Sequence, residues 1–234
     1  MRHRLFVRSK PETGQRLQIA GDEFHHAARV ARVRENEEVE VFDGRGNAAR
    51  AHVRVLGNNE ITVEIGEPIH NRESKFPITL ALAIINLDKF ELVLQKGTEL
   101  GVNAFVPMIT DRVEVRPERY KGKGERWEKI VLEAVKQCGR SVIPSIGEPA
   151  AFSEVIKRDG VMVFFDADIK GGALPAVIKE ATLLIGPEGG WSDDEIALAH
   201  DEGCIPHRLG PRRLRAETAA IVATALVAAR YGDI

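Results

Sequence analysis

A glycine-rich turn between residues 185 and 191 is the part of the chain best suited to bind a ligand. It contains Ile185-Gly-Pro-Glu-Gly-Gly-Trp191 and follows an apolar run that is typical of a buried strand. A helix is predicted from Ser192, with Glu195 three positions later, which is the capping-box pattern. Glycines at the carboxyl end of a strand let the backbone approach a ligand closely, so the turn predicts a ligand site at a sheet edge.

The pattern also indicates which ligand this turn would take. It is neither GxGxxG nor GxxxxGK[ST], so it matches neither the dinucleotide nor the P-loop fingerprint. Asp193, Asp194 and Glu195 occupy the positive end of the predicted helix, where a pyrophosphate would meet three carboxylates. The turn therefore favours a neutral or cationic ligand, and a purely structural turn is the alternative.

A second candidate turn lies between residues 208 and 219. It reads Arg208-Leu-Gly-Pro-Arg-Arg-Leu-Arg-Ala-Glu-Thr-Ala219 and follows a predicted strand that ends at Leu209-Gly210. We expect this turn at the same sheet edge as the first one. Three of its four arginines crowd the turn, where they could either have a functional role or simply lie on the protein surface. The next helix has seven alanines between Ala216 and Ala229, which allows close packing against its own sheet or a second subunit.

The remaining polar candidates lie on two predicted helices. Lys96 and Glu99 are spaced i, i+3, which is typical of a solvated ion pair. An apolar stripe runs along one helix face from Trp127 to Cys138, so Cys138 is predicted to be a core residue. Arg140 lies on the flank of the same helix, beside this stripe. The seven histidines show no metal-ligand spacing, and metal catalysis is not expected.

Two domains are predicted to position these turns. Residues 1–70 contain alternating apolar residues at 39–41, 48–56 and 61–65, a pattern that is typical of strands. One helix is predicted among them, from Asp22 to Arg32, with Asp22 as its expected N-cap. They suggest a small β-barrel. After a polar linker, residues 74–234 alternate apolar runs at 78–85, 104–109, 161–165 and 182–185 with helical patterns, which predicts an α/β domain with a mostly parallel sheet.

Composition limits the class of protein and its partners. The 234 residues are 44% hydrophobic and 29% charged, with two cysteines and no CxxC pair, so we expect a globular cytoplasmic protein. No apolar run is long enough to span a membrane, and the charged start argues against export. Although the net charge is −2, basic residues are concentrated at 1–34, 112–140 and 205–215, which favours a polyanionic partner.

Taken together, these stretches resemble the RsmE family, the bacterial ribosomal small-subunit RNA uridine N3-methyltransferases of the SPOUT superfamily. The resemblance covers nearly the whole chain and is most specific in the two turns, which match the two cofactor motifs of the family. Further matches are His26 to Arg32 with Val39 to Gly44, Lys89 with Gln95 to Gly101, and Trp127 with Glu133 to Arg140. The chain departs from the family pattern at Ala31, Asn36, Trp191 and Arg213, where Leu, Gly, Phe and an aliphatic residue are usual.

The resemblance implies a PUA-like β-barrel followed by an α/β domain whose C-terminal segment forms a trefoil knot. It also implies a cytoplasmic homodimer that binds S-adenosylmethionine, without a metal or a membrane, and methylates N3 of one uridine in the 16S ribosomal RNA of the small subunit. A sulfonium cation on a neutral adenosine fits a turn that does not suit phosphate.

The resemblance further implies roles for individual residues. Arg215 would stabilise charge on the uracil oxygens, and Glu217 would accept the N3 proton, with Glu188 as a second candidate and a helix cap as the other role for Glu217. RNA phosphates would contact Arg2, Arg4, Arg8, Arg29, Arg32 and Arg140. The cofactor would contact Ile185, Gly186, Pro187, Glu188, Gly189, Gly190, Leu209, Gly210, Leu214, Arg215 and Thr218.

Three alternatives stay open at this point. The chain could methylate another RNA or another base atom, which nucleoside mass spectrometry would distinguish. It could be a non-catalytic RNA-binding protein, for which damaged cofactor turns would be expected. A small-molecule α/β enzyme would not need the basic β-rich domain.

Overall fold

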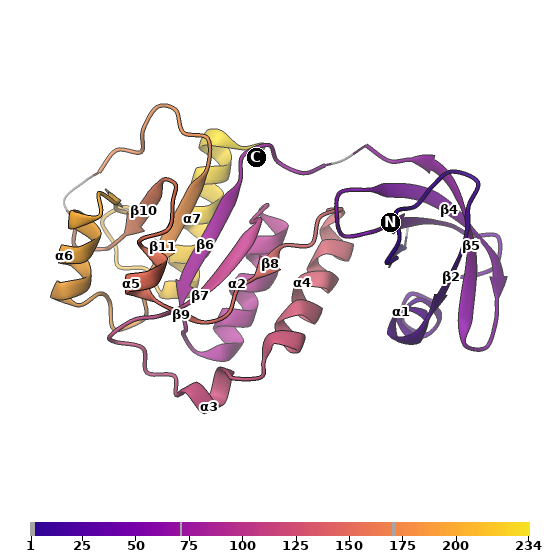
Figure 1. The fold of residues 1–234 in the computed structure, drawn as a ribbon, viewed down its shortest axis with the longest axis horizontal. Helices are drawn as coiled ribbons and strands as arrows, with labels where there is room; N and C mark the ends of the chain where they lie inside the picture. The colour runs from indigo at the N-terminus through magenta and orange to yellow at the C-terminus, as the bar shows by residue number, and fades with distance from the viewer. Residues whose placement is uncertain (1–2, 71, 170–171) are drawn as a thin grey trace. The chain divides into compact units, whose positions relative to one another are not determined.

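The structure, a computed structural model, describes residues 3–70, 72–169 and 172–234 (Figure 1). It divides into two compact units. The N-terminal unit comprises Met1–Glu73 and Val135–Ile143, and the C-terminal unit comprises Ser74–Ala134 and Pro144–Ile234. A segment from the middle of the sequence therefore belongs to the N-terminal unit.

The N-terminal unit is built on a five-stranded sheet with the order β1-β3-β4-β5-β2. All neighbours are antiparallel except β1 and β3. The predicted strands are confirmed as β3, β4 and β5, whereas β1 and β2 are short edge strands that the sequence pattern did not predict. The predicted barrel is a curled sheet whose buried core includes Leu5, Val41, Val53 and Val63. The strands are β1 (Arg4–Phe6), β2 (Arg16–Ala20), β3 (Glu38–Phe42), β4 (Ala48–Leu56) and β5 (Glu60–Pro68).

The helical segment of this unit differs from the prediction of one helix with Asp22 as its N-cap. The N-cap is Ala20, which makes no side-chain capping bond, and Asp22 lies within the first turn. The segment consists of a short α-helix, α1 (Gly21–His25), followed by a π-helix, η1 (His26–Ala31). It ends at Arg32, whose φ of 54° is left-handed and cannot continue a helix.

The C-terminal unit contains the predicted parallel sheet, in the order β12-β10-β11-β6-β7-β8, with the short strand β9 also paired to β7. Every strand pair in it is parallel, which confirms the α/β class. The strands β6 and β11 are buried almost throughout. The strands are β6 (Ile78–Ala83), β7 (Ala104–Ile109), β8 (Ser145–Ile146), β9 (Ala150–Ala151), β10 (Met162–Phe165), β11 (Ala181–Ile185) and β12 (Ile205–His207).

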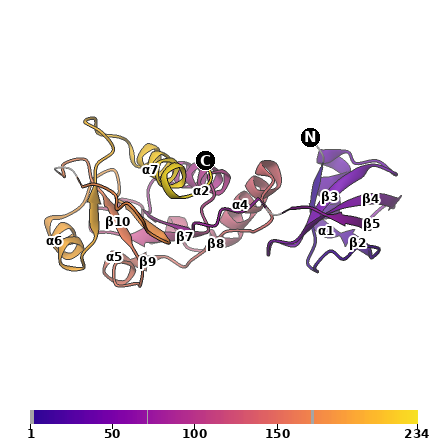
Figure 2. The ribbon, with the colours of Figure 1, turned by 90° about the horizontal axis from the view of Figure 1, so that it is seen from above.

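Helices cover both faces of this sheet, with α2 and α7 on one face and α5 and α6 on the other (Figure 2). The predicted apolar stripe on α4 buries Trp127 and Val131, and the Trp127 ring packs 4.8 Å from that of Phe90 on α2. Cys138, predicted as a core residue, is half-buried. The helices are α2 (Leu87–Glu99), α3 (Pro117–Tyr120), α4 (Gly124–Cys138), α5 (Phe152–Val155), α6 (Asp193–Asp201) and α7 (Ala216–Tyr231). No helix of the described residues is long and apolar enough to cross a membrane.

Candidate functional site

Three neighbouring strands of the C-terminal sheet end at the same level. Phe165 at the end of β10 is the register partner of Ile185 in β11 and of His207 in β12. The turns that follow them therefore meet at one sheet edge, which is where ligands bind in parallel α/β sheets. A cavity of about 640 Å³ lies there, within the C-terminal unit.

Both predicted glycine turns line this cavity. Of the residues predicted to hold the cofactor, only Thr218 is not part of the lining. It lies on the exposed side of α7, whereas Ala216 and Ala219 of the same helix do line the cavity. The predicted residues in the lining are Ile185, Gly186, Pro187, Glu188, Gly189, Gly190, Leu209, Gly210, Leu214 and Arg215.

The first turn leaves no room for a side chain at Gly186 and little room for one at Gly189. A Cβ on Gly186 would lie 2.8 Å from the Trp191 ring, and a Cβ on Gly189 would lie 3.2 Å from Cβ of Arg112. Gly190 has a φ of 72°, which favours glycine. The Trp191 indole donates a hydrogen bond of 3.0 Å to the Phe165 carbonyl oxygen and thereby joins the turn to the end of β10.

The capping box predicted at α6 is confirmed and extends to a third residue. The Ser192 hydroxyl accepts from the Glu195 amide at 3.2 Å, and the Glu195 carboxylate accepts from the Ser192 amide at 2.8 Å. The second oxygen of this buried carboxylate accepts from the Asp111 amide at 3.0 Å. The loop after β7 is therefore held against the start of α6.

Among the lining residues that sequence reasoning missed are two groups that follow predicted strands. Asp166, Ala167 and Asp168 follow β10, and Arg112 follows β7, so both groups come directly after strands that the apolar runs predict. The same rule of strand carboxyl ends that identified the glycine turns would have found them. Arg112 donates to the Gly189 carbonyl oxygen at 3.1 Å, and Arg213 pairs with Asp168 at 2.7 Å between two of the turns.

The lining mixes both signs of charge. Four carboxylates line the cavity, at Asp166, Asp168, Glu188 and Asp193, together with four guanidinium groups at Arg112, Arg212, Arg213 and Arg215. Two of these guanidinium groups are already engaged, by the Gly189 carbonyl and by Asp168. Carboxylates and guanidinium groups are equal in number in the lining, so its charge alone selects neither a cationic nor an anionic ligand.

The two residues predicted as catalytic lie in different surroundings. Arg215 is exposed and lines the cavity. Glu217 is not part of the lining, because its side chain forms an ion pair with Lys89 of α2 at 3.3 Å. It is not a helix cap either, since the N-cap of α7 is Arg215 and no side-chain capping bond occurs there within the described residues. Glu188, the second candidate for the proton acceptor, does line the cavity.

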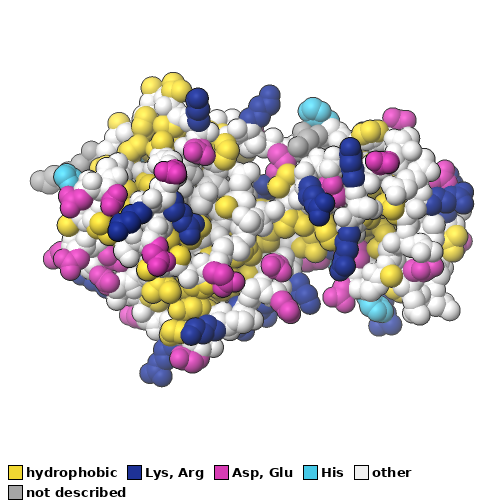
Figure 3. Space-filling view, viewed as in Figure 1, with side chains coloured by type: hydrophobic (Ala, Val, Ile, Leu, Met, Phe, Trp, Pro, Cys, Tyr) yellow, Lys and Arg dark blue, Asp and Glu magenta, His cyan; other side chains and the backbone are white. Residues whose placement is uncertain are grey.

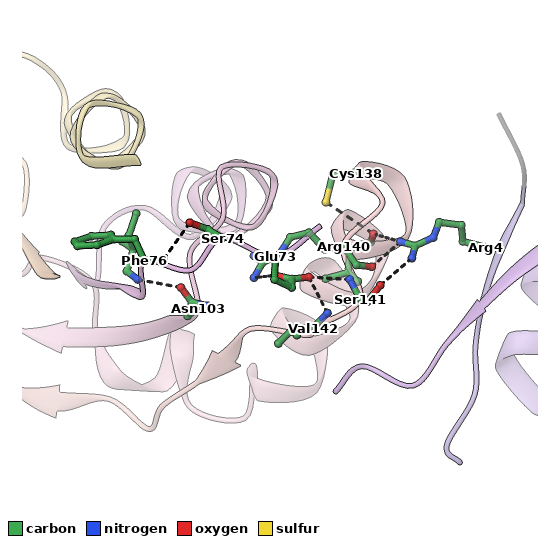
Figure 4. Close-up of polar contacts among 11 residues, drawn as sticks. Arg4, Glu73, Ser74, Phe76, Asn103, Cys138, Arg140, Ser141 and Val142 are labelled. Carbon is green, nitrogen blue, oxygen red and sulfur yellow. Dashed lines mark hydrogen bonds and ion pairs between the residues drawn. The ribbon is translucent and has the colours of Figure 1, made fainter. Parts of the chain in front are cut away.

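Two of the residues predicted to contact RNA are instead buried in the N-terminal unit (Figure 4). Arg4 is 9% exposed, pairs with Glu40 at 3.0 Å and donates to the Arg140 carbonyl oxygen at 2.6 Å. Arg140 is 6% exposed and pairs with Glu73 at 2.8 Å. Burial lowers the pKa of Arg4, and Glu40 partly offsets this effect. The expectation that Arg4 and Arg140 contact RNA was wrong, because both side chains hold the unit together.

The other predicted RNA contacts of the N-terminal unit remain available. Arg8, Arg29 and Arg32 are exposed, and Arg2 lies outside the described residues. Figure 3 shows Lys and Arg side chains on the viewed face of this unit. Among the described residues, no group of three or more His, Cys, Asp or Glu side chains could hold a metal ion.

Comparison with known proteins agrees with this arrangement. Residues 72–228 match the family model of an RNA methyltransferase domain, and residues 19–66 match that of an RNA methyltransferase PUA domain. The chain is 32% identical to the ribosomal RNA small subunit methyltransferase E of Synechocystis, over 97% of this chain and 77% of that protein. It is 31% identical to the protein of that name from Bacillus subtilis, over 92% of this chain and 91% of the relative.

Solved structures give the same result. A ribosomal RNA small subunit methyltransferase E from Neisseria gonorrhoeae, bound to S-adenosyl methionine, superimposes with a TM-score of 0.92 at 31% identity and 100% coverage of both chains. A protein from Legionella pneumophila in complex with bound SAM gives 0.93 at 32% identity, again with 100% coverage of both chains. The chain therefore belongs to the ribosomal RNA small subunit methyltransferase E family.

Proposed function

We propose that this protein transfers the methyl group of S-adenosylmethionine to N3 of a specific uridine in the 16S ribosomal RNA of the small subunit. The observation that carries the proposal is the cavity formed by both glycine turns at the ends of β10, β11 and β12. The proposal is supported by the family and by the Neisseria relative, which is bound to S-adenosyl methionine.

The residues of the cavity fit this cofactor. A volume of about 640 Å³ lies in the usual range for a site that encloses a molecule of that size. Because residues 186 and 189 are glycines, no side chain at these two positions stands between the backbone of the turn and the cofactor. The carboxylates of Asp166 and Glu188, which also line the cavity, suit a cationic ligand. When bound, S-adenosylmethionine would supply a methyl group that its sulfonium has already activated.

The protein must then control charge on the uracil ring. N3 carries a proton, and its lone pair is delocalised into the two neighbouring carbonyls, so the proton has to leave as the methyl group arrives. Arg215, exposed in the lining, can stabilise the negative charge that develops on the uracil oxygens. Glu188 is our candidate for the proton acceptor, a choice supported by its exposed position in the lining, whereas Glu217 is engaged with Lys89.

The two parts of the chain would divide the work. We assign RNA binding to residues 1–70 and methyl transfer to residues 74–234, supported by family matches at 19–66 and 72–228. Arg8, Arg29 and Arg32 would contact RNA phosphates, which position a substrate without reading its sequence. The trefoil knot and the cytoplasmic location are further parts of the proposal, and they rest on the family resemblance.

A homodimer is also part of the proposal. Val222 and Leu226, one helical turn apart on α7, are 40% and 38% exposed, and Leu92 on the neighbouring α2 is 41% exposed. This apolar face supports a second copy of the chain as its partner. Ala223 lies in the same helix but is fully buried, so it faces the interior of its own unit.

Nucleoside mass spectrometry of ribosomal RNA tests the function. RNA from cells without the protein should lack one N3-methyluridine of 16S rRNA, and the purified protein should restore it with S-adenosylmethionine. A different modified nucleoside or a different RNA would support the alternative methyltransferase. If calorimetry shows that the protein does not bind S-adenosylmethionine, the non-catalytic alternative is favoured.

A further inference from the structure

One wall of the cavity in the C-terminal unit is an irregular segment. Residues 208–215 connect β12 to α7 without helix or strand structure, and we term them the strap. Leu209 and Leu214 are half-buried, and the other six residues of the strap are exposed. Every strap residue except Arg208 and Pro211 lines the cavity. The strap therefore borders the ligand site without a buried core of its own.

Few side-chain contacts hold the strap in place. Arg208 donates a hydrogen bond of 3.2 Å to the Pro211 carbonyl oxygen, but both residues belong to the strap. Across the described residues, the contact between Arg213 and Asp168, at 2.7 Å, is the one side-chain hydrogen bond or ion pair that joins the strap to another segment. Exposed segments with few contacts open at a low cost in free energy. The strap can therefore move when this single pair separates.

The carboxylate partner of Arg213 lies on a turn that the sheet fixes. The Asp166 amide donates to the His207 carbonyl oxygen at 3.2 Å, which continues the pairing of β10 with β12. The Asp166 carboxylate in turn accepts a hydrogen bond of 2.6 Å from the Asp168 amide, so this side chain closes the turn after β10. Asp168 is thereby held in the cavity lining, and its ion pair ties the strap to a firmly held turn.

The strength of this pair suits a contact that opens and closes. The side chains of Arg213 and Asp168 are 66% and 78% exposed. An ion pair so exposed to water contributes little free energy and is screened by salt. Arg212, the preceding residue, also lines the cavity, but among the described residues its guanidinium has no hydrogen-bond or ion-pair partner. Two neighbouring arginines of the strap thus differ in whether they hold it to the sheet.

We propose that Arg213 and Asp168 are positioning residues whose ion pair fastens the strap over the bound cofactor and separates when the cofactor enters or leaves. The inference rests on the proposed function for the identity of the ligand, S-adenosylmethionine. Because six strap residues line the cavity, displacement of the strap removes one wall of the site. The pair therefore sets how fast the cofactor exchanges, without touching the methyl group that is transferred.

A direct electrostatic effect of Arg213 on the cofactor predicts the opposite result. S-adenosylmethionine is a net cation at neutral pH, because its sulfonium and ammonium groups outnumber its single carboxylate. A nearby guanidinium repels such a ligand, so its removal would slow dissociation if repulsion were its main effect. If the guanidinium fastens the strap instead, its removal speeds dissociation. The sign of the change distinguishes the two roles.

The test compares variants of the pair with a matched control. The variants are Arg213→Gln, Asp168→Asn, both together, and the charge swap Arg213→Glu with Asp168→Arg. The control is Arg212→Gln, which removes the same charge from the same segment and breaks no ion pair. Surface plasmon resonance on the immobilised full-length protein measures the dissociation rate of S-adenosylmethionine at low and high KCl concentrations. Circular dichroism establishes that each variant is folded.

Arg213→Gln should speed dissociation by about two- to fivefold, the range expected for an exposed ion pair. The double variant should dissociate no faster than the faster single variant, because either change already breaks the pair. The charge swap should restore a rate close to that of the wild type, and Arg212→Gln should not speed dissociation. High KCl should raise the wild-type rate toward that of Arg213→Gln, because salt screens the exposed pair. This salt dependence probes the pair without any substitution.

Several results would overturn the inference. These are an equal or slower dissociation rate in folded Arg213→Gln, additive effects of the two single variants, an equal acceleration in the Arg212→Gln control, or a wild-type rate that does not change with KCl. Failure of the proposed function is recognised separately. The wild-type protein would then bind S-adenosylmethionine without methylating 16S rRNA, and the dissociation rates would still report on the strap.

Discussion

Lys89 of α2 and Glu217 of α7 form an ion pair, with 3.3 Å between Nζ and Oε1. The other carboxylate oxygen of Glu217, Oε2, is buried and lacks a hydrogen-bond partner within the described residues. The pair therefore joins the first turn of α7 to α2. Ala216 and Ala219, in the same turn of α7, line the cavity instead.

This arrangement separates the effects of two carboxylate substitutions. Glu188→Gln should lower the rate of methyl transfer at saturating S-adenosylmethionine by about a hundredfold or more, because the proton acceptor is removed. Glu217→Gln should keep turnover within severalfold and lower the free energy of unfolding by about 1 kcal/mol. Single-turnover kinetics and urea unfolding measure the two effects. The opposite distribution of effects would return the role of proton acceptor to Glu217.

Gly189→Val is expected to weaken cofactor binding by about tenfold or more in a folded protein. A Cβ at this position already lies 3.2 Å from Cβ of Arg112, so the branched side chain must displace Arg112 or the turn. Calorimetry with S-adenosylmethionine measures the change, and Arg112→Ala combined with Gly189→Val should recover part of the affinity. An unchanged affinity in the single variant would mean that the cofactor does not bind at this turn.

Trp191→Phe should destabilise the protein by about 1 kcal/mol. The indole N–H donates to the Phe165 carbonyl oxygen, and a phenyl ring would leave that buried oxygen without its donor. Urea unfolding measures the decrease, with Phe152→Leu as a control that alters packing around the ring without removing the hydrogen bond. Equal stability of Trp191→Phe and wild type would show that this bond contributes little.

Cys204 should resist thiol reagents in the native protein. Burial raises the pKa of its thiol to about 11, with a smaller contribution from Glu202. Because the folded pKa exceeds the unfolded one, the resulting stability is complete below the unfolded pKa and is lost as the pH rises toward 11. Cys204→Ala should unfold with a weaker dependence on pH in this window. Rapid labelling of native Cys204 at pH 8, identified by mass spectrometry, would contradict the prediction.

Val222→Asp with Leu226→Asp should convert the proposed homodimer into a monomer without unfolding it, because both side chains are exposed on α7. Ala223→Leu provides the contrast, since it overpacks the interior of the unit and should cost about 1–3 kcal/mol of stability. Analytical ultracentrifugation at micromolar concentration measures the assembly. A wild-type monomer that methylates RNA at full rate would exclude a functional dimer.

The features predicted from the sequence are those with a strong local signal. Continuous apolar runs predicted the buried strands β6, β7, β10 and β11, and Ser192 with Glu195 predicted the start of α6. Strand β1 escaped prediction because it has only three residues, too few for an alternating pattern, and strand β2 because only one of its five residues is buried. The change from α-helix to π-helix at His26 carries no periodic signal in so short a segment.

The candidate site was predictable where backbone conformation demands glycine, and it was less predictable for charged side chains. An arginine on a basic segment is usually exposed, but Arg4 and Arg140 find their carboxylate partners at Glu40 and Glu73 only in the folded chain. The resemblance likewise implied that Glu217 accepts the N3 proton, but in the folded chain its side chain pairs with Lys89 and does not line the cavity.

The segment 135–143 has a consequence for how this protein could be divided or recombined. The chain passes between the two units at residues 73–74, 134–135 and 143–144, so no single cut separates them. A fragment ending near residue 70 would lack the carbonyl groups of Val135 and Arg140, to which the buried Arg4 donates. The N-terminal unit is therefore not an autonomous module that gene fusion could exchange at one junction, and its transfer to another enzyme would have to include the end of α4.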